Sequence, residues 1–158
     1  MAHNLQQCQI LIRKAAVAKA KVSLLHLIIK AALYLSCIGN TENHGSPHQA
    51  LFLPEASDYI ASSAEETVSL VKSVHDSEFI RGLQSAARST NMAINVGVHE
   101  PGNSSEKVKN TLLWIDEKGE IVQRYQKLHL FDVEIEGGPV LRESKLCVAP
   151  LCVLFGAD

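Results

Sequence analysis

Apolar residues recur every three or four positions along the first part of the chain. Asn4 precedes them as an expected helix cap, with Gln7 three residues later in a variant of the capping box. Lysines at positions 14, 19 and 21 fall outside the apolar stripe. The pattern predicts an amphipathic helix over residues 4–21 that packs one face on a core. The apolar stripe consists of Leu5, Cys8, Leu11, Ile12, Ala15 and Ala16.

The pattern changes over residues 22–49. Residues 22–38 are almost entirely apolar, but His26 and Lys30 interrupt them. A helix that spans a bilayer needs about 20 apolar residues without a central charge, which argues against a membrane span. Residues 39–49 are polar and contain glycine and proline, which is typical of a loop. We interpret residues 22–49 as an insertion that is foreign to its surroundings.

Short apolar runs and amphipathic segments alternate over the next hundred residues. Residues 51–53 predict the end of a buried strand, which Pro54 terminates because proline has no amide hydrogen. Ser63 and Asp76 are expected to cap two helices. The runs 92–98, 111–115 and 120–125 predict a buried strand followed by a hairpin. This order indicates a single α/β layered domain.

Composition and charge narrow the class of protein. The chain has 158 residues, of which 46% are hydrophobic and 20% charged, as in one soluble globular domain. The net charge of −2 and the lack of a basic run argue against a nucleic-acid or membrane partner. The four cysteines lack metal-ligand spacing, so we expect free thiols in a reducing, cytoplasmic compartment. The mitochondrion stays open as an alternative.

Two polar residues stand where buried segments end. Glu55 follows Pro54 directly, and a carboxylate at the edge of an apolar core suits a general base. Lys127 leaves the second strand of the expected hairpin, where a fixed cation can stabilise developing negative charge. The plainer alternatives are a solvated loop glutamate and a surface lysine whose stem lies along the protein.

Two motifs carry a family resemblance. Leu51-Phe52-Leu53-Pro54-Glu55 resembles the strand-PE motif of the nitrilase superfamily of carbon–nitrogen hydrolases, and residues 125–132 (YQKLHLFD) resemble its lysine motif. The order of elements between them is also similar, over residues 50–144. The stretches PEASDYIA (54–61) and DVEI…GGPVLRES (132–144) resemble the deaminated-glutathione amidase branch, with ω-amidase-like members as the neighbouring alternative.

The resemblance implies Glu-Lys-Cys chemistry on a small linear amide. Glu55 would act as general base, Lys127 would face the oxyanion, and Glu143 would orient the lysine and the substrate. A cysteine thiolate would attack the amide carbonyl, ammonia would leave, and water would hydrolyse the thioester. The resemblance implies no metal or organic cofactor, a small-molecule amide as partner, and a homo-oligomer as in the family.

Three features depart from the family pattern. We expect no strand before the first helix. The neighbouring strand would then have an exposed edge without a strand paired to it. Residues 22–49 separate the first helix from the PE strand; codons GTAAGT for Val22-Ser23 and CAG for Gln49 would fit a retained intron. The family's C-[YF]-D-x-R-F-P cysteine motif is missing, and Cys147 and Cys152 lie in a non-matching tail, residues 145–158.

These features together predict an incomplete domain. The expected fold is a partial α-β-β-α sandwich of nitrilase type that lacks the first strand and the C-terminal half, and we expect the chain to be inactive. One alternative is a non-catalytic fragment that binds full-length homologues. A second is a small membrane-associated protein anchored by residues 22–38, against which Lys30 argues.

Overall fold

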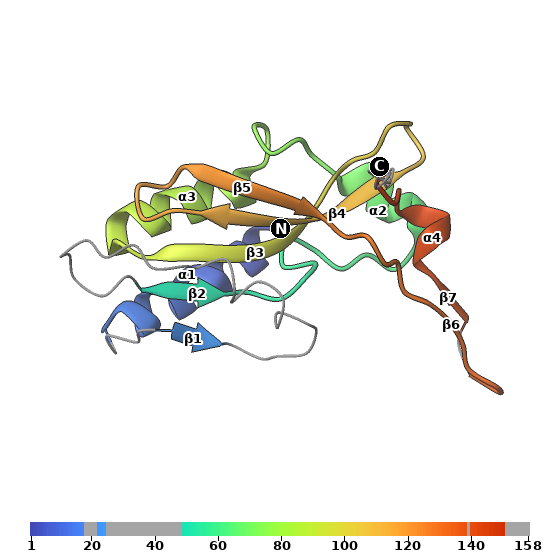
Figure 1. Cartoon of the computed structure of the whole chain (residues 1–158), viewed down its shortest axis with the longest axis horizontal. Coiled ribbons are helices and arrows are strands. Elements are labelled where there is room, and N and C mark those ends of the chain that lie inside the picture. Colours follow the sequence, from blue (N-terminus) through green and yellow to red (C-terminus); the bar gives the residue numbers. More distant parts are fainter. Residues whose placement is uncertain (18–21, 25–48, 139, 151–158) are drawn as a thin grey trace, which may run out of the picture.

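The computed structural model describes residues 1–17, 22–24, 49–138 and 140–150. A five-stranded mixed sheet forms its centre, with the strands in sequential order (Figure 1). The first three strands are parallel and the last two are antiparallel to their neighbours. The strands are β1 (Val22–Leu24), β2 (Ala50–Phe52), β3 (Ala93–Pro101), β4 (Val108–Ile115) and β5 (Ile121–Gln126). The predicted α/β class is therefore confirmed.

Two helices, α1 (Ala2–Val17) and α3 (Glu78–Thr90), pack on each other and on one face of the sheet (Figure 1). Alternate strand residues point at these helices, because successive side chains of a strand lie on opposite faces. The core between the layers contains several side chains with no exposed surface, namely Ile12, Leu51, Leu83, Ile94, Leu113 and Ile115. The predicted amphipathic stripe of the first helix is thus part of the core through Cys8, Ile12 and Ala15.

The first helix begins earlier than its sequence suggested. Asn4 lies inside α1 rather than at its cap. Its Nδ2 donates to the carbonyl oxygens of Ser57 at 3.2 Å and Asp58 at 3.3 Å. The capping prediction was wrong because a tertiary contact, invisible to local pattern, uses the amide. Asn4 therefore ties the helix layer to the turn that follows β2.

The strand β1 corrects the expectation of a bare sheet edge. Val22, Ser23 and Leu24 pair in parallel with Ala50, Leu51 and Phe52 of β2. The start of the segment interpreted as an insertion thus forms an edge strand after the first helix. Residues 25–48, which include most of the proposed membrane anchor, lie outside the described residues. Among the described helices, none has the length and hydropathy needed to cross a bilayer.

Both helices between β2 and β3 start at serine caps. Ser63 caps α2 (Ala64–Leu70) and accepts a hydrogen bond from the amide of Glu66 at 3.1 Å, as predicted. Ser77, rather than the predicted Asp76, caps α3 and accepts from the amide of Ile80 at 3.3 Å. Asp76 instead accepts a hydrogen bond from the hydroxyl of Ser73. Both carboxylate and hydroxyl side chains suit a cap, so sequence left this choice to the local geometry.

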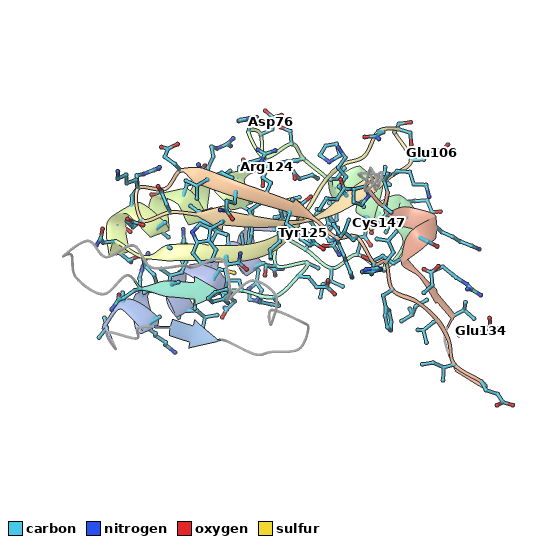
Figure 2. The ribbon with its side chains drawn as sticks, in the orientation of Figure 1. Asp76, Glu106, Arg124, Tyr125, Glu134 and Cys147 are labelled. Atoms are coloured by element: carbon cyan, nitrogen blue, oxygen red, sulfur yellow. The ribbon has the colours of Figure 1, made fainter. Side chains whose placement is uncertain are left out.

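The predicted hairpin is formed by β4 and β5 around the turn at Asp116–Gly119. Gly119 has a φ of 78°, which favours glycine, and the carboxylate of Asp116 accepts from the amides of Lys118 and Glu120. Tyr125 pairs with Leu112 across the strands, on the face away from α1 and α3 (Figure 2). On this second face the ring of Phe52 meets Trp114 edge to face at 5.7 Å.

Beyond the sheet, the chain forms a small arm. A two-stranded hairpin of β6 (Asp132–Glu134) and β7 (Val140–Arg142) extends away from the sheet and returns into the short helix α4 (Glu143–Leu146) (Figure 1). Its apolar side chains are about half exposed, as Leu141 at 47% and Ile135 at 51% show. The amide of Val148 then bonds the carbonyl of Val108, which returns the chain to β4.

Candidate active site

The turn that carries Glu55 is locked against the neighbouring strand. The amide of Ser57 donates to the carbonyl of Gly97 at 3.0 Å, and the amide of Gly97 donates to the carbonyl of Pro54 at 3.2 Å. Ala56 has a φ of 54°, an uncommon conformation for a residue with a side chain. A Cβ on Gly97 would lie 2.4 Å from the Cα of Glu55, so only glycine admits this approach.

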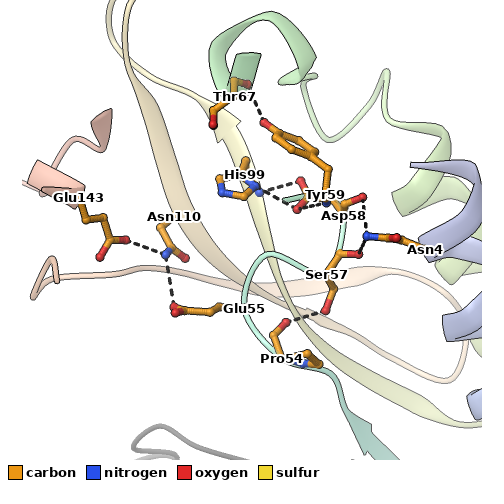
Figure 3. Close-up of polar contacts among 10 residues, drawn as sticks. All are labelled: Asn4, Pro54, Glu55, Ser57, Asp58, Tyr59, Thr67, His99, Asn110 and Glu143. Atoms are coloured by element: carbon orange, nitrogen blue, oxygen red, sulfur yellow. Dashed lines mark hydrogen bonds and ion pairs between the residues drawn. The ribbon is translucent and has the colours of Figure 1, made fainter. Parts of the chain in front are cut away.

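The residues after Glu55 anchor the same turn to the core (Figure 3). The buried carboxylate of Asp58 accepts from the backbone amide of His99 at 2.9 Å and contacts the His99 Nδ1 at 3.0 Å. The ring of Tyr59 stacks on His99, and its hydroxyl donates to the carbonyl of Thr67 at 2.9 Å. Burial, with the charge of Asp58 second, raises the pKa of Tyr59, so the phenol keeps its proton for this bond.

Lys127 follows directly after β5 and is held by backbone and side chain. Its amide donates to the carbonyl of Asn110 at 2.9 Å, which continues the strand pairing. Its Nζ lies 2.9 Å from Oε2 of Glu143 and 3.2 Å from Oε2 of Glu55. The structure thus brings together all three residues that the sequence singled out, from segments far apart in the chain.

Glu143 begins α4, and its side chain turns back toward the sheet. Its Oε2 accepts from Lys127 and from the amide of Phe131 at 2.6 Å, while its Oε1 accepts from Nδ2 of Asn110 at 2.9 Å. The Asn110 amide also reaches Oε2 of Glu55 at 3.4 Å (Figure 3). We call Glu55, Asn110, Lys127 and Glu143 the Lys127 cluster.

The opposite charges of the Lys127 cluster stabilise the ionised forms of its lysine and of Glu143. Burial alone would lower the pKa of Lys127, but the hydrogen bonds and negative charges of Glu143 and Glu55 raise it overall. Burial likewise would raise the pKa of Glu143, but bonds from Lys127, Phe131 and Asn110 lower it. The lysine is therefore a cation and Glu143 an anion at neutral pH. Such a cation can stabilise an oxyanion that forms beside it.

Cys147 lies at the end of α4 (Figure 2), where its amide donates to the carbonyl of Glu143 at 2.7 Å. Its side chain is buried, and burial, then the charge of Glu143, raises the pKa of its thiol to about 11. Such a thiol is almost fully protonated at neutral pH and is a weak nucleophile. The other cysteine of the tail, Cys152, lies outside the described residues.

A separate cavity of about 470 Å³ lies on the opposite face of β4. Lys109, Thr111 and Arg124 are among its lining residues, and they alternate along the strands with residues of the other face. Glu55, Lys127 and Glu143 do not line it. We place the candidate active site at the Lys127 cluster because there one half-buried lysine pairs with two carboxylates from distant segments of the chain. The described residues contain no group of three or more metal-binding side chains.

Sequence reasoning missed Asn110, Gly97 and the pair of Asp58 with His99. Asn110 gave little signal, because asparagine is depleted in strands and the predicted strand began only at residue 111, whereas β4 begins at Val108. Gly97 in the middle of an apolar strand was a signal, because such glycines mark a close backbone approach. Asp58 and His99 gave no local signal, since their contact joins residues far apart in the chain.

A family model matches almost the whole of this chain. The model of the carbon-nitrogen hydrolases matches residues 1–150. The chain belongs to the carbon–nitrogen hydrolase family. The predicted nitrilase-superfamily membership is therefore confirmed.

Two curated relatives are similar to part of the chain. A probable hydrolase nit2 of Schizosaccharomyces pombe is 43% identical over 97 residues, which is 61% of this chain and 35% of the relative. The deaminated glutathione amidase of Rattus norvegicus is 36% identical over 97 residues, 59% of this chain and 29% of that protein. The matched region thus spans about a third of these relatives.

Solved structures share the fold of the chain. The crystal structure of the Caenorhabditis elegans NitFhit protein superimposes with a TM-score of 0.67 at 27% identity, over 95% of this chain and 30% of that one. An amidase of Nesterenkonia sp. AN1 has a TM-score of 0.61 at 19% identity, over 94% and 44% of the two chains, and shows the fold alone. The chain therefore has a nitrilase-type fold that corresponds to part of these structures.

Proposed function

We propose that the Lys127 cluster is the base-and-cation part of an amidase site that converts a small linear amide to a carboxylic acid and ammonia. The observation that carries this proposal is the position of the Lys127 Nζ, 2.9 and 3.2 Å from two carboxylates at the strand ends. Glu55 acts as general base, Lys127 faces the oxyanion, and Glu143 orients the lysine. These are the roles that the family resemblance implies, and the exposure of the two carboxylates supports them: 48% of the Glu55 side chain is exposed but only 17% of that of Glu143.

The chemistry requires a nucleophile beside this cluster. A thiol gives its proton to Glu55, and its sulfur attacks the amide carbonyl to form a tetrahedral oxyanion opposite Lys127. The oxyanion collapses to a thioester while Glu55 gives the proton back to the departing nitrogen, which leaves as ammonia. Glu55 then takes a proton from water, whose oxygen attacks the thioester, and the sulfur leaves as the thiol with the carboxylic acid as product. Before the reaction Lys127 is charged at neutral pH, because the hydrogen bonds and charges of Glu143 and Glu55 outweigh burial and raise its pKa.

We infer that the substrate class is that of deaminated glutathione or a similar short amide. The names of the rat, mouse, human and cattle relatives support this choice, although each matches only part of its length. The family-like homo-oligomer and the cytoplasmic location belong to the same proposal. Size-exclusion chromatography and imaging of a tagged chain test them.

We further propose that this 158-residue chain does not turn over amides alone. The buried Cys147 thiol, with a pKa of about 11, does not supply a thiolate, and its sequence context lacks the family's cysteine motif. Lys127 and Glu55 would then form a site that lacks its nucleophile. An added small alkylthiol should partly replace it.

The test is ammonia release from a deaminated-glutathione-type amide, with and without added alkylthiol. The chain alone should release no ammonia above buffer, and the thiol should produce a rate that Glu55→Gln and Lys127→Met each lower at least about tenfold. Lys118→Ala, in the exposed turn of the hairpin, is the matched control and should leave the rate unchanged. Turnover without thiol would contradict the proposed inactivity. A thiol-dependent rate that survives both substitutions would contradict the proposed roles.

A further inference from the structure

Asn110 occupies a bridging position that no motif of the sequence indicated. It lies near the start of β4, directly across from His99 of β3. Its single side-chain nitrogen reaches two carboxylates, Glu143 Oε1 at 2.9 Å and Glu55 Oε2 at 3.4 Å (Figure 3). An amide nitrogen has two hydrogens, so each can be directed at a different carboxylate.

The two glutamates differ in how many of their carboxylate oxygens accept hydrogen bonds. Both oxygens of Glu143 accept hydrogen bonds, one from Asn110 and the other from Lys127 and Phe131. On Glu55, Lys127 and Asn110 both donate to Oε2. Within the described part of the chain, Oε1 of Glu55 has no hydrogen-bond partner. One carboxylate is therefore saturated, and the other keeps one oxygen available.

We propose that Asn110 is a positioning residue that holds the two glutamates on either side of Lys127 and leaves Oε1 of Glu55 as the proton-accepting oxygen. This inference rests on the proposed function, in which Glu55 is the base. A proton that leaves a thiol or a water molecule would bond to Oε1 and leave a thiolate or hydroxide behind. The partners on Oε2 would stay in place during this transfer.

A neutral amide suits this position better than a charged group. A second cation at position 110 would compete with Lys127 for both carboxylates, and a carboxylate would repel them. The Asn110 amide stabilises both anions without adding charge, so Lys127 stays the single cation of the cluster. The bond from Asn110 also contributes to the lowered pKa of Glu143.

Nuclear magnetic resonance of the isotope-labelled 158-residue chain tests the bridge directly. The two side-chain amide protons of Asn110 should respond to different partners, one shifting in Glu55→Gln and the other in Glu143→Gln. Asn110→Ala should raise the pKa of the Glu143 carboxyl by about 0.5 to 1, as expected for one lost hydrogen bond to a partly exposed anion. Asn103→Ala, in an exposed loop, is the matched control and should leave that pKa unchanged.

Two results would overturn the inference. The first is a Glu143 titration in Asn110→Ala that matches that of Asn103→Ala. The second is an Asn110 amide whose resonances do not change in Glu55→Gln; this measurement keeps Asn110 in place and so does not depend on the folding of the alanine variant. Neither readout uses a substrate. A failed thiol rescue with an intact bridge would therefore reject the proposed function alone, and a missing bridge would reject the role of Asn110 alone.

Discussion

The two carboxylates beside Lys127 are held in opposite ways. Glu55 lies on a turn whose backbone is fixed by Gly97 and by the buried Asp58, yet its side chain is 48% exposed. Glu143 lies at the end of an exposed hairpin, yet both of its oxygens are bonded and its side chain is 17% exposed. One residue is anchored through its main chain, and the other through its carboxylate.

The difference separates two tasks that a single glutamate performs poorly. A proton acceptor needs an unoccupied oxygen at a fixed place, which a rigid turn provides. A counter-ion for a half-buried lysine needs several donors around it, because an unpaired charge there would be costly. The Glu55 turn and the Glu143 arm are therefore expected to respond differently to matched substitutions.

The largest effect is expected where the Glu55 turn meets β3. Gly97→Ala would place a Cβ 2.4 Å from the Cα of Glu55, so the backbone must move, at a cost of about 3 kcal/mol in the free energy of unfolding. Gly138→Ala on the arm is the control, because its nearest neighbour is Cγ2 of Ile135 at 2.9 Å, in a side chain that is 51% exposed and can turn into solvent. Urea unfolding followed by the fluorescence of the single tryptophan, Trp114, measures both. Equal losses in the two variants would show that the turn is no more rigid than the arm.

A smaller loss is expected from the buried carboxylate behind the turn. Asp58→Asn weakens the charged bonds to the amide and ring of His99, at a cost of about 2 kcal/mol. Asp132→Asn is the counterpart on the arm, where an exposed carboxylate accepts from the amide and hydroxyl of Ser144. Asp132→Asn should lower the free energy of unfolding by clearly less than Asp58→Asn does. Thermal unfolding monitored by circular dichroism compares them, and the reverse order would contradict the comparison.

The smallest of the three effects concerns the charge pair itself and depends on pH. Glu143→Gln should destabilise the fold by about 1 kcal/mol at neutral pH, since the pair with Lys127 is partly exposed. The pKa of Glu143 lies below its ordinary 4.5, so this contribution is present above pH 4.5 and is lost as pH falls through the folded value. The pKa of Lys127 lies above its ordinary 10.5, so the contribution is also lost as pH rises beyond that range.

Urea unfolding of the wild-type chain and of Glu143→Gln from pH 3 to 11 measures the difference in their free energies of unfolding. Arg142→Ala is the control on the same arm, because its pair with Glu134 joins side chains that are 41% and 67% exposed. Arg142→Ala should lower the free energy of unfolding by less than about 0.5 kcal/mol at every pH. A difference between wild type and Glu143→Gln that stays constant below pH 4.5 would mean that the Lys127 pair does not stabilise the fold.

Patterns of neighbouring residues were sufficient for several elements. Pro54 ended a strand as predicted, and the run around Trp114 formed the first strand of the hairpin. Ser63 capped its helix because the capping interaction lies within one turn. Asn4, in contrast, was assigned to a cap although its amide bonds the turn after Glu55. The strand β1 was missed because a three-residue segment, Val22-Ser23-Leu24, carries no signal of the partner it pairs with.

The sequence by itself determined the family, the α/β class, and the choice of Glu55, Lys127 and Glu143 as candidates, since each depends on short motifs in a readable order. Only the tertiary structure decided that these three side chains meet, that Gly97 admits the Glu55 turn, and that Asn110 bridges the carboxylates. The physical reason is the range of the interactions. A cap or a strand end depends on residues within a few positions, whereas the bond from Asn110 to Glu55 joins residues 55 positions apart.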